Sequence, residues 1–171
     1  GDAHEVVDES TPTEPTRIGP QIAVAAEQFL QQKWLEQEYS AKQLIIIRLA
    51  GIYGPGRIPL AEKLRSGQPL QVPQDGWLNL AHVSDIAAML ADVMHRRMQH
   101  RLYVFSDGQA VPRLEFYRYL AGLCGVAEPQ FVTPDPTSSR SQRAARKRVN
   151  PQRLVDELEF KFHFPSYREG L

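Results

Sequence analysis

The densest group of side chains that could bind a ligand is a basic run from Pro136 to Val155. It contains no acidic residue and six cationic ones: Arg140, Arg143, Arg146, Lys147, Arg148 and Arg153. Guanidinium groups bind phosphate oxygens through paired hydrogen bonds, and ammonium groups bind them as point charges. The run therefore predicts either an anion-binding loop or a solvated surface loop, and the sequence leaves both interpretations open.

Three polar residues lie around the predicted start of a helix, namely Asn79, His82 and Asp85. His82 could bond a substrate hydroxyl, although a buried, satisfied histidine at a strand end is the favoured interpretation. Asp85 falls in the first turn of the helix, where a carboxylate stabilises the helix dipole. That structural role is favoured over catalysis.

The composition is that of an ordinary globular domain, with 171 residues, 42% of them hydrophobic and 23% charged. Lys plus Arg and Asp plus Glu are equal at 20 each, so no global charge favours nucleic acid or an anionic membrane. The single cysteine, Cys124, cannot form an intrachain disulfide. We expect no membrane span, no metal site and no signal peptide at Gly1, and we expect a cytoplasmic protein.

Apolar periodicity and turn residues predict an alternation of helices and strands. The apolar run Leu44–Ile47 is typical of a strand covered on both faces. Before and just after this strand, the pattern predicts a helix from Pro20 to about Tyr39, a Gly54-Pro55-Gly56 turn, and a short helix with Leu60 and Leu64 that stops at Gly67. Further along, it predicts a helix capped by Ser84, a strand at Leu102–Phe105, and a last helix after Asn150-Pro151. Between that strand and the last helix, a helix from Pro112 to Gly125 is predicted to turn Leu114, Tyr117, Leu120 and Cys124 inward.

This order of elements predicts a parallel α/β sheet. We expect Leu44–Arg48 and Leu102–Phe105 to be parallel neighbours, joined by a crossover that contains the helix from Ser84. Only two strands are strong in the pattern, and two parallel strands cannot close a core alone. The pattern therefore predicts that further strands lie outside this chain.

Six short sequence motifs occur one after another along the chain. They are Asp8-Glu9-Ser10-Thr11-Pro12 with Pro15, the stretch from Ile47 to Arg57, the stretch from Asn79 to Ala87, Tyr103 to Gly108, Lys147 to Asn150, and Tyr167 to Leu171. Together they resemble the C-terminal half of an extended or atypical short-chain dehydrogenase/reductase, the NAD-dependent epimerase/dehydratase family. Each motif alone is weak, but six in order are specific.

The resemblance implies a doubly wound parallel, Rossmann-type sheet with a small, mostly helical substrate-binding region. It divides the chain into the end of the Rossmann-type domain (1–57), a substrate-region insertion (58–83), a Rossmann-type helix and strand (84–105) and a C-terminal substrate-binding region (106–171). The Gly-rich phosphate loop of the family does not occur in this sequence. We expect it in an N-terminal half that is absent from this chain.

The family's catalytic Tyr-x-x-x-Lys pair is also missing. Ala25-Ala26-Glu27 sets the register, and it places the tyrosine position at Gly19 and the lysine position at Ala23. Neither residue can act as an acid or a base. The resemblance is therefore to atypical members, and the catalytic residues stay unknown.

The resemblance also implies a set of binding residues. Leu49, Ala50 and Gly51 would line the nicotinamide end of the cofactor. The substrate-binding candidates are Tyr53, Arg57, Asn79, His82, Lys147 and Arg148. In a sugar-nucleotide enzyme the basic run lies over the substrate cleft, where it could bind a diphosphate.

The leading hypothesis is an NAD(P)-dependent epimerase/dehydratase-like oxidoreductase or isomerase acting on a nucleotide sugar or another phosphorylated small molecule. The alternatives are a non-catalytic dinucleotide-binding regulator or scaffold of the same fold, and an inactive fragment. NAD or NADP would bind the full-length protein and not this chain alone. The expected partners are the missing N-terminal half or a second copy in a homodimer, with no nucleic acid and no membrane.

Overall fold

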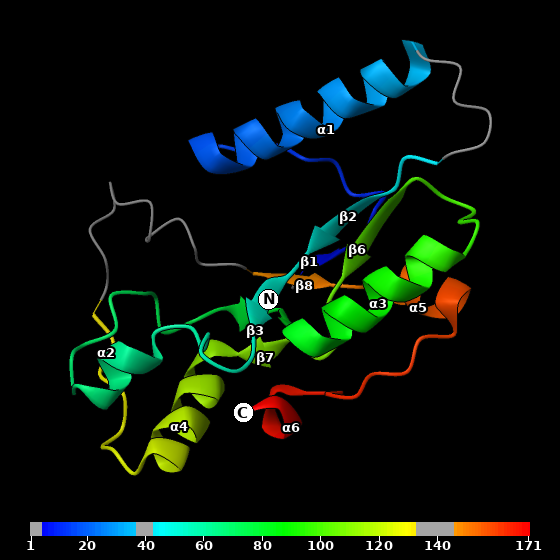
Figure 1. The fold of residues 1–171 in the computed structure, drawn as a ribbon. Coiled ribbons are helices and arrows are strands. Elements are labelled where there is room, and N and C mark those ends of the chain that lie inside the picture. The colour runs from blue at the N-terminus through cyan, green and yellow to red at the C-terminus, as the bar shows by residue number, and fades with distance from the viewer. Residues whose placement is uncertain (1–4, 37–42, 133–145) are drawn as a thin grey trace.

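The computed structural model describes residues 5–36, 43–132 and 146–171. Its helices are α1 (Ile18–Glu36), α2 (Ala61–Arg65), α3 (Val83–His95), α4 (Arg113–Cys124), α5 (Gln152–Leu158) and α6 (Tyr167–Gly170). Its strands are β1 (Glu5–Val7), β2 (Ile46–Leu49), β3 (Gly51–Tyr53), β4 (Trp77–Leu78), β5 (Leu80–His82), β6 (Leu102–Phe105), β7 (Val111–Pro112) and β8 (Lys147–Val149). In Figure 1, α1 lies on one side of the β2–β6 pair, and α3 and α5 lie on the other.

The strands form parallel pairs for the most part. β2 pairs in parallel with β6, and the register joins Ile46 to Leu102. β3 pairs in parallel with β5, and β1 with β8, whereas β4 and β7 are antiparallel. The predicted parallel neighbours and their crossover through α3 are thus confirmed, because α3 lies between β2 and β6 in the chain.

Besides the two strands that the pattern predicts, the described residues contain six further short strands, which makes eight. The unpredicted strands have two or three residues each, which is too short for an alternation of apolar and polar residues to appear. The strongest predicted strand is also displaced, since it begins at Ile46 and not at Leu44.

The helix starts differ from the predictions by one or two residues, and the predicted end of the first helix, near Tyr39, lies outside the described residues. α1 begins at Ile18, so Pro20 occupies its third position, where a backbone N–H has no partner within the helix anyway. α3 begins at Val83, and its cap is His82, whose Nδ1 accepts the N–H of Ser84 at 3.2 Å. Ser84 itself is therefore inside the helix. Pro112 precedes α4, whose C-terminal Gly125 has the left-handed conformation with φ 64°.

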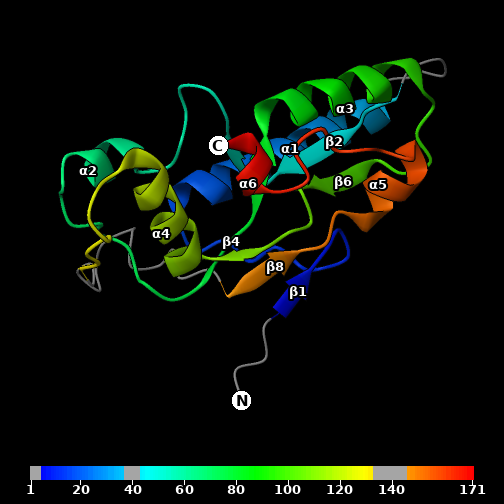
Figure 2. The ribbon, with the colours of Figure 1, turned by 90° about the horizontal axis from the view of Figure 1, so that it is seen from below.

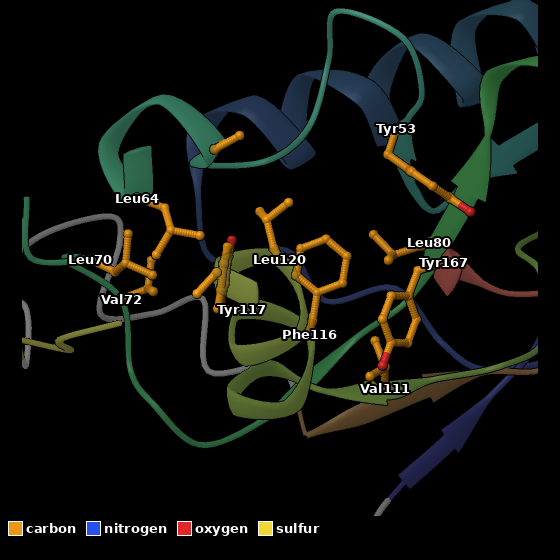
Figure 3. Packing of buried hydrophobic residues seen from close by; sticks show 12 residues of the cluster. Tyr53, Leu64, Leu70, Val72, Leu80, Val111, Phe116, Tyr117, Leu120 and Tyr167 are labelled. Atoms are coloured by element: carbon orange, nitrogen blue, oxygen red, sulfur yellow. The ribbon is translucent and has the colours of Figure 1, made fainter. Parts of the chain in front are cut away.

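The buried side chains form two hydrophobic clusters. One joins α2, α4 and α6 with β3 and β5, and its centre is Phe116, Leu120 and Tyr53 (Figure 3). The other joins α3, α5 and β6 around Met89, Phe105 and Leu154. Cys124, predicted to face inward, is only half-buried, because α4 turns Phe116 and Ala121 into the core in its place.

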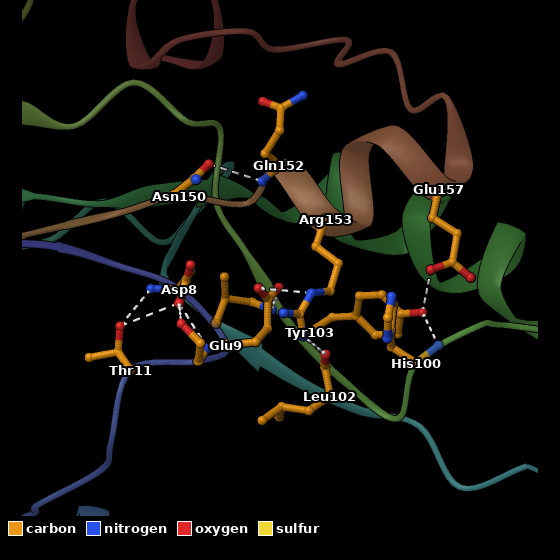
Figure 4. Close-up of polar contacts among 12 residues, drawn as sticks. Asp8, Glu9, Thr11, His100, Leu102, Tyr103, Asn150, Gln152, Arg153 and Glu157 are labelled. Carbon is orange, nitrogen blue, oxygen red and sulfur yellow. Dashed lines mark hydrogen bonds and ion pairs between the residues drawn. The ribbon is translucent and has the colours of Figure 1, made fainter.

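The acidic motif after β1 ties distant segments together. Asp8 accepts the backbone N–H and the hydroxyl of Ser10, at 2.8 and 2.6 Å, in a tight turn. The buried Glu9 accepts the N–H of Val104 at 2.9 Å and lies 3.4 Å from Nε of Arg153 (Figure 4). Through these two contacts, this single carboxylate connects the end of β1 with β6 and α5.

Among the described helices, none is both long enough and apolar enough to cross a membrane. The described residues also include no group of three or more histidine, cysteine or acidic side chains that could hold a metal ion.

Candidate functional site

The candidate site lies at the carboxyl ends of the parallel strands. In open parallel sheets, ligands bind in the crevice beyond those ends. Leu49 is the last residue of β2, Ala50 follows it and Gly51 begins β3. Ser106 and Asp107 follow β6, which is the neighbour of β2. The predicted cofactor-lining residues therefore share an edge with a buried carboxylate that the sequence analysis did not identify.

The predicted cofactor-lining stretch is shaped by backbone packing. Leu49 is exposed at the end of β2, and the backbone N–H of Gly51 donates to the carbonyl of Asn79 at 2.9 Å. A Cβ on Gly51 would lie 3.0 Å from that same carbonyl oxygen. The glycine is therefore required by the close approach of residue 79, and it leaves an uncovered surface beside Leu49.

A pocket of about 530 Å³ opens between the end of β6 and the segment that leads from β8 into α5. Its charged lining residues, among those described, are Asp107 and Arg148, and its floor includes Phe162. Pockets of this size hold small molecules in other proteins. The pocket thus brings a predicted substrate-binding residue, Arg148, together with Asp107.

Asp107 has an environment that is unusual for a carboxylate. The residue is 5% exposed, Oδ1 accepts the N–H of Gln109 at 2.9 Å, and Oδ2 is buried with no hydrogen-bond partner in the described part of the chain. Burial raises the pKa of Asp107 to about 7, and the carboxylates of Asp85 and Glu169 act in the same direction. Near neutral pH this group can therefore accept or release a proton.

Arg148 reaches the pocket from β8. Its guanidinium carbon lies 5.5 Å from the centre of the Trp77 ring, which is a cation–π distance. Its Nε is buried, and none of the described residues forms a hydrogen bond with it. Lys147, which precedes Arg148 on the strand, is exposed. Arg140 and Arg143 of the basic run lie outside the described residues.

Asn79 holds β8 in place. Its Nδ2 donates to the carbonyl of Lys147 at 2.9 Å, and its Oδ1 accepts the N–H of Val149 at 2.8 Å. These two bonds copy the pairing of a neighbouring strand. The Asn79 amide therefore has a structural role: it positions β8, the strand that carries Arg148, and does not itself line the pocket.

His82, Tyr53 and Asp85 form a buried polar group beneath the C-terminal segment. The rings of Tyr53 and His82 meet edge to face with centroids 5.2 Å apart, and burial lowers the pKa of His82 and raises that of Tyr53. Asp85 accepts the backbone N–H groups of His163 and Phe164 at 2.9 and 3.0 Å. This is the buried, satisfied histidine of the favoured interpretation, and Asp85 anchors a segment in addition to its place in the first turn.

The remaining predicted positions are exposed. Arg57 lies in the turn after β3, where its backbone N–H donates to the carbonyl of Gly54 at 2.9 Å. Gly19 and Ala23, at the expected tyrosine and lysine positions, lie exposed on α1. The structure brings neither Arg57 nor these two residues to the pocket.

Asp107, which lines the pocket, and Trp77, which lies against Arg148, were not predicted as site residues from the sequence. The Ser106-Asp107-Gly108 stretch looks like a turn, and Asp107 does form one through Oδ1. The available signal was its position directly after an apolar strand, because polar residues there lie at the ligand-binding edge of a parallel sheet.

The chain is similar in sequence and fold to several solved structures. A functionally unknown conserved protein from Silicibacter pomeroyi DSS has a solved structure that is 34% identical, with a TM-score of 0.80 over 99% of this chain and 60% of that one. A candidate NAD-dependent epimerase/dehydratase from Methylobacillus flagellatus is 28% identical, with a TM-score of 0.71 over 97% of this chain and 55% of that one. The chain is related to the NAD-dependent epimerase/dehydratase superfamily. No family model matches it.

Two further proteins match over nearly the whole chain. Protein YeeZ of Escherichia coli K12 is 26% identical over 166 residues, which is 97% of this chain and 55% of YeeZ. MoeE5 in complex with UDP-glucose and NAD shares the fold with a TM-score of 0.77 at 21% identity, over 99% of this chain and 58% of that one. The chain thus spans little more than half the length of these relatives.

Proposed function

We propose that this chain is the C-terminal part of an atypical NAD(P)-dependent epimerase/dehydratase-like oxidoreductase or isomerase. Its substrate would be a nucleotide sugar or another phosphorylated small molecule. The observation that carries the proposal is the 28% identity over 97% of the chain to the candidate epimerase/dehydratase from Methylobacillus flagellatus. The carboxyl-end location of the candidate residues supports it further.

The residues of this chain fit one end of a dinucleotide. The exposed Leu49 and the side-chain-free surface at Gly51 would contact the nicotinamide, which, when bound, takes up and returns a hydride. Arg148 would bind an anionic part of the substrate, with Asn79 holding its strand in place. The pyrophosphate would have to bind outside this chain, because the family's Gly-rich loop does not occur in it.

A second function, a dinucleotide-binding regulator or scaffold, is favoured by one observation. Gly19 and Ala23 supply no proton-transferring group at the positions where the family has its tyrosine and lysine. A protein that binds NAD(P) without that pair would hold the cofactor and turn over slowly or not at all.

The test uses the intact protein that contains this chain. NADH and NADPH binding is followed by the fluorescence of the nicotinamide, and turnover of UDP-glucose and dTDP-glucose by NMR of the sugar ring in the presence of NAD and NADP. Binding with turnover supports the enzyme, and binding without turnover supports the regulator. Absence of both would overturn the two proposals together.

A further inference from the structure

Two buried polar atoms of residues that line the pocket have no hydrogen-bond partner among the described residues. They are Oδ2 of Asp107 and Nε of Arg148, and they are not paired with each other. More than nine in ten buried polar groups in folded proteins have a hydrogen-bond partner, so an orphaned pair at one pocket needs an explanation. A ligand that supplies both partners is one explanation.

The two side chains need different partners: Arg148 needs a hydrogen-bond acceptor, and Asp107 needs a donor. Arg148 offers hydrogen-bond donors and a fixed positive charge, and the Trp77 ring at 5.5 Å holds the guanidinium in place. Asp107 already uses Oδ1 for the N–H of Gln109, and its buried Oδ2 lacks a donor among the described residues, which a hydroxyl would supply. One molecule with an anionic end and a hydroxyl would satisfy both.

We propose that the Asp107–Arg148 pocket binds a phosphate ester of a sugar or another polyol. The phosphate accepts hydrogen bonds from Arg148, and a sugar hydroxyl donates to Oδ2 of Asp107. The pocket volume of about 530 Å³ lies within the range of small-molecule sites. This inference rests on the proposed function for the class of substrate, and it adds the site and the orientation of the ligand.

A phosphate suits the pocket better than a carboxylate does. Arg146, Lys147 and Arg148 are consecutive, and the two that precede Arg148 are exposed beside it. A phosphate ester carries close to two negative charges at neutral pH, so it gains more than a carboxylate from such a row of cations. A guanidinium also matches two phosphate oxygens at once.

The experiment is calorimetric titration of the intact protein with three probes, namely glucose 1-phosphate, inorganic phosphate and glucose. We expect saturable binding of glucose 1-phosphate, at least tenfold tighter than that of phosphate or glucose. Arg148→Gln and Asp107→Asn should each weaken glucose 1-phosphate binding about tenfold or more. Arg148→Lys, which keeps the charge but removes Nε, should also weaken it.

Lys161→Gln is the matched control, because Lys161 is exposed and does not line the pocket. It removes one positive charge from the same region and should leave the affinity unchanged. Equal binding of phosphate and glucose 1-phosphate would overturn the role of the hydroxyl. Unchanged binding in the Asp107 and Arg148 variants would overturn the site.

A measurement on the unaltered protein covers the case in which a variant does not fold. Glucose 1-phosphate should shift the NMR resonance of the Arg148 side-chain Nε–Hε group, and an unshifted resonance at saturation would overturn the inference. The nicotinamide fluorescence assay is independent of this signal. Loss of sugar-phosphate binding with intact NAD(P) binding therefore refutes the pocket and leaves the proposed function standing.

Discussion

Asp107 has a charge state that depends on its surroundings more than on its own chemistry. Burial raises its pKa from the ordinary 3.8 to about 7, and the carboxylates of Asp85 and Glu169 add to the effect. Between about pH 4 and pH 7, the folded protein therefore holds a proton that the unfolded chain has released. Stability from this group is complete at the acidic end of that window and is lost as the pH rises through it.

Asp107→Asn should remove this dependence. The amide keeps the acceptor for the Gln109 N–H but does not ionise. In urea unfolding at about pH 4 and about pH 8, the variant should gain stability relative to the unaltered protein as the pH rises, by up to about 4 kcal/mol at about 1.36 kcal/mol per pKa unit. An equal pH dependence in both proteins would contradict the raised pKa.

Asn79→Ala should loosen β8 from the rest of the sheet. The substitution removes both side-chain hydrogen bonds, to the carbonyl of Lys147 and from the N–H of Val149. We expect a loss of about 1–3 kcal/mol in the free energy of unfolding, because the Val149 N–H is left partly buried without its acceptor. Chemical denaturation measures it, and Gln74→Ala, at an exposed position, is the control.

At the scale of the elements, Gly51 joins β3 to the turn before β5. Gly51→Ala would place a Cβ 3.0 Å from the carbonyl oxygen of Asn79, so one strand must shift. We expect a loss of about 1–3 kcal/mol, as for other overpacked sites. Gly122→Ala is the opposite case, because nothing lies within 4 Å of its added Cβ on α4, and it should be neutral or stabilise by up to about 1 kcal/mol.

Thermal unfolding of the two glycine variants separates packing from ligand contact. If Gly51→Ala retains full stability and loses only NAD(P) binding in the intact protein, then its role is in the ligand surface and the packing explanation fails.

The sequence predicted the long elements better than the short ones. Helices such as α3 and the strand β6 have enough residues for an apolar period to be visible. Strands such as β4, with two residues, are defined by their partners in space, which local patterns do not encode. The residues of the pocket divide in the same way, since Arg148 belongs to a visible basic run whereas Asp107 depends on a tertiary environment.

At the scale of the whole molecule, α1 is the least covered element. None of its residues is buried, and its exposed apolar residues are Ile18, Ile22, Phe29, Leu30 and Leu35. An ion pair between Glu27 and Arg48, at 2.6 Å, links α1 to β2 (Figure 2 shows α1 behind β2). So much exposed apolar surface on one helix is typical of an interface.

We therefore expect the chain, purified by itself, to associate with a second copy through α1 and the edge of β2 that pairs with no strand among the described residues. Light scattering after size exclusion should give at least a dimer, and Phe29→Glu should shift it toward monomer. Leu123→Glu, at an exposed apolar position on α4, should have no effect. A monomer with the unaltered sequence would rule out this association.

The same chain should not hold a dinucleotide tightly. The Gly-rich loop that supplies most anion contacts in this superfamily does not occur in its sequence. Titration of the 171-residue chain with NADH and NADPH should show no saturable change in nicotinamide fluorescence at micromolar ligand. Stoichiometric binding would mean that residues such as Leu49 and Gly51 suffice, contrary to expectation.

The contact of Tyr53 with the C-terminal segment has a consequence for synthesis of the protein. The Tyr53 hydroxyl donates to the carbonyl of Ser166 at 3.2 Å, across 113 residues of chain, and Tyr167 packs in the same cluster (Figure 3). A ribosome delivers the chain from its N-terminus. The cluster around Tyr53 therefore stays open until residues 166 and 167 have left the exit tunnel, and during that interval its aromatic surface is available to chaperones.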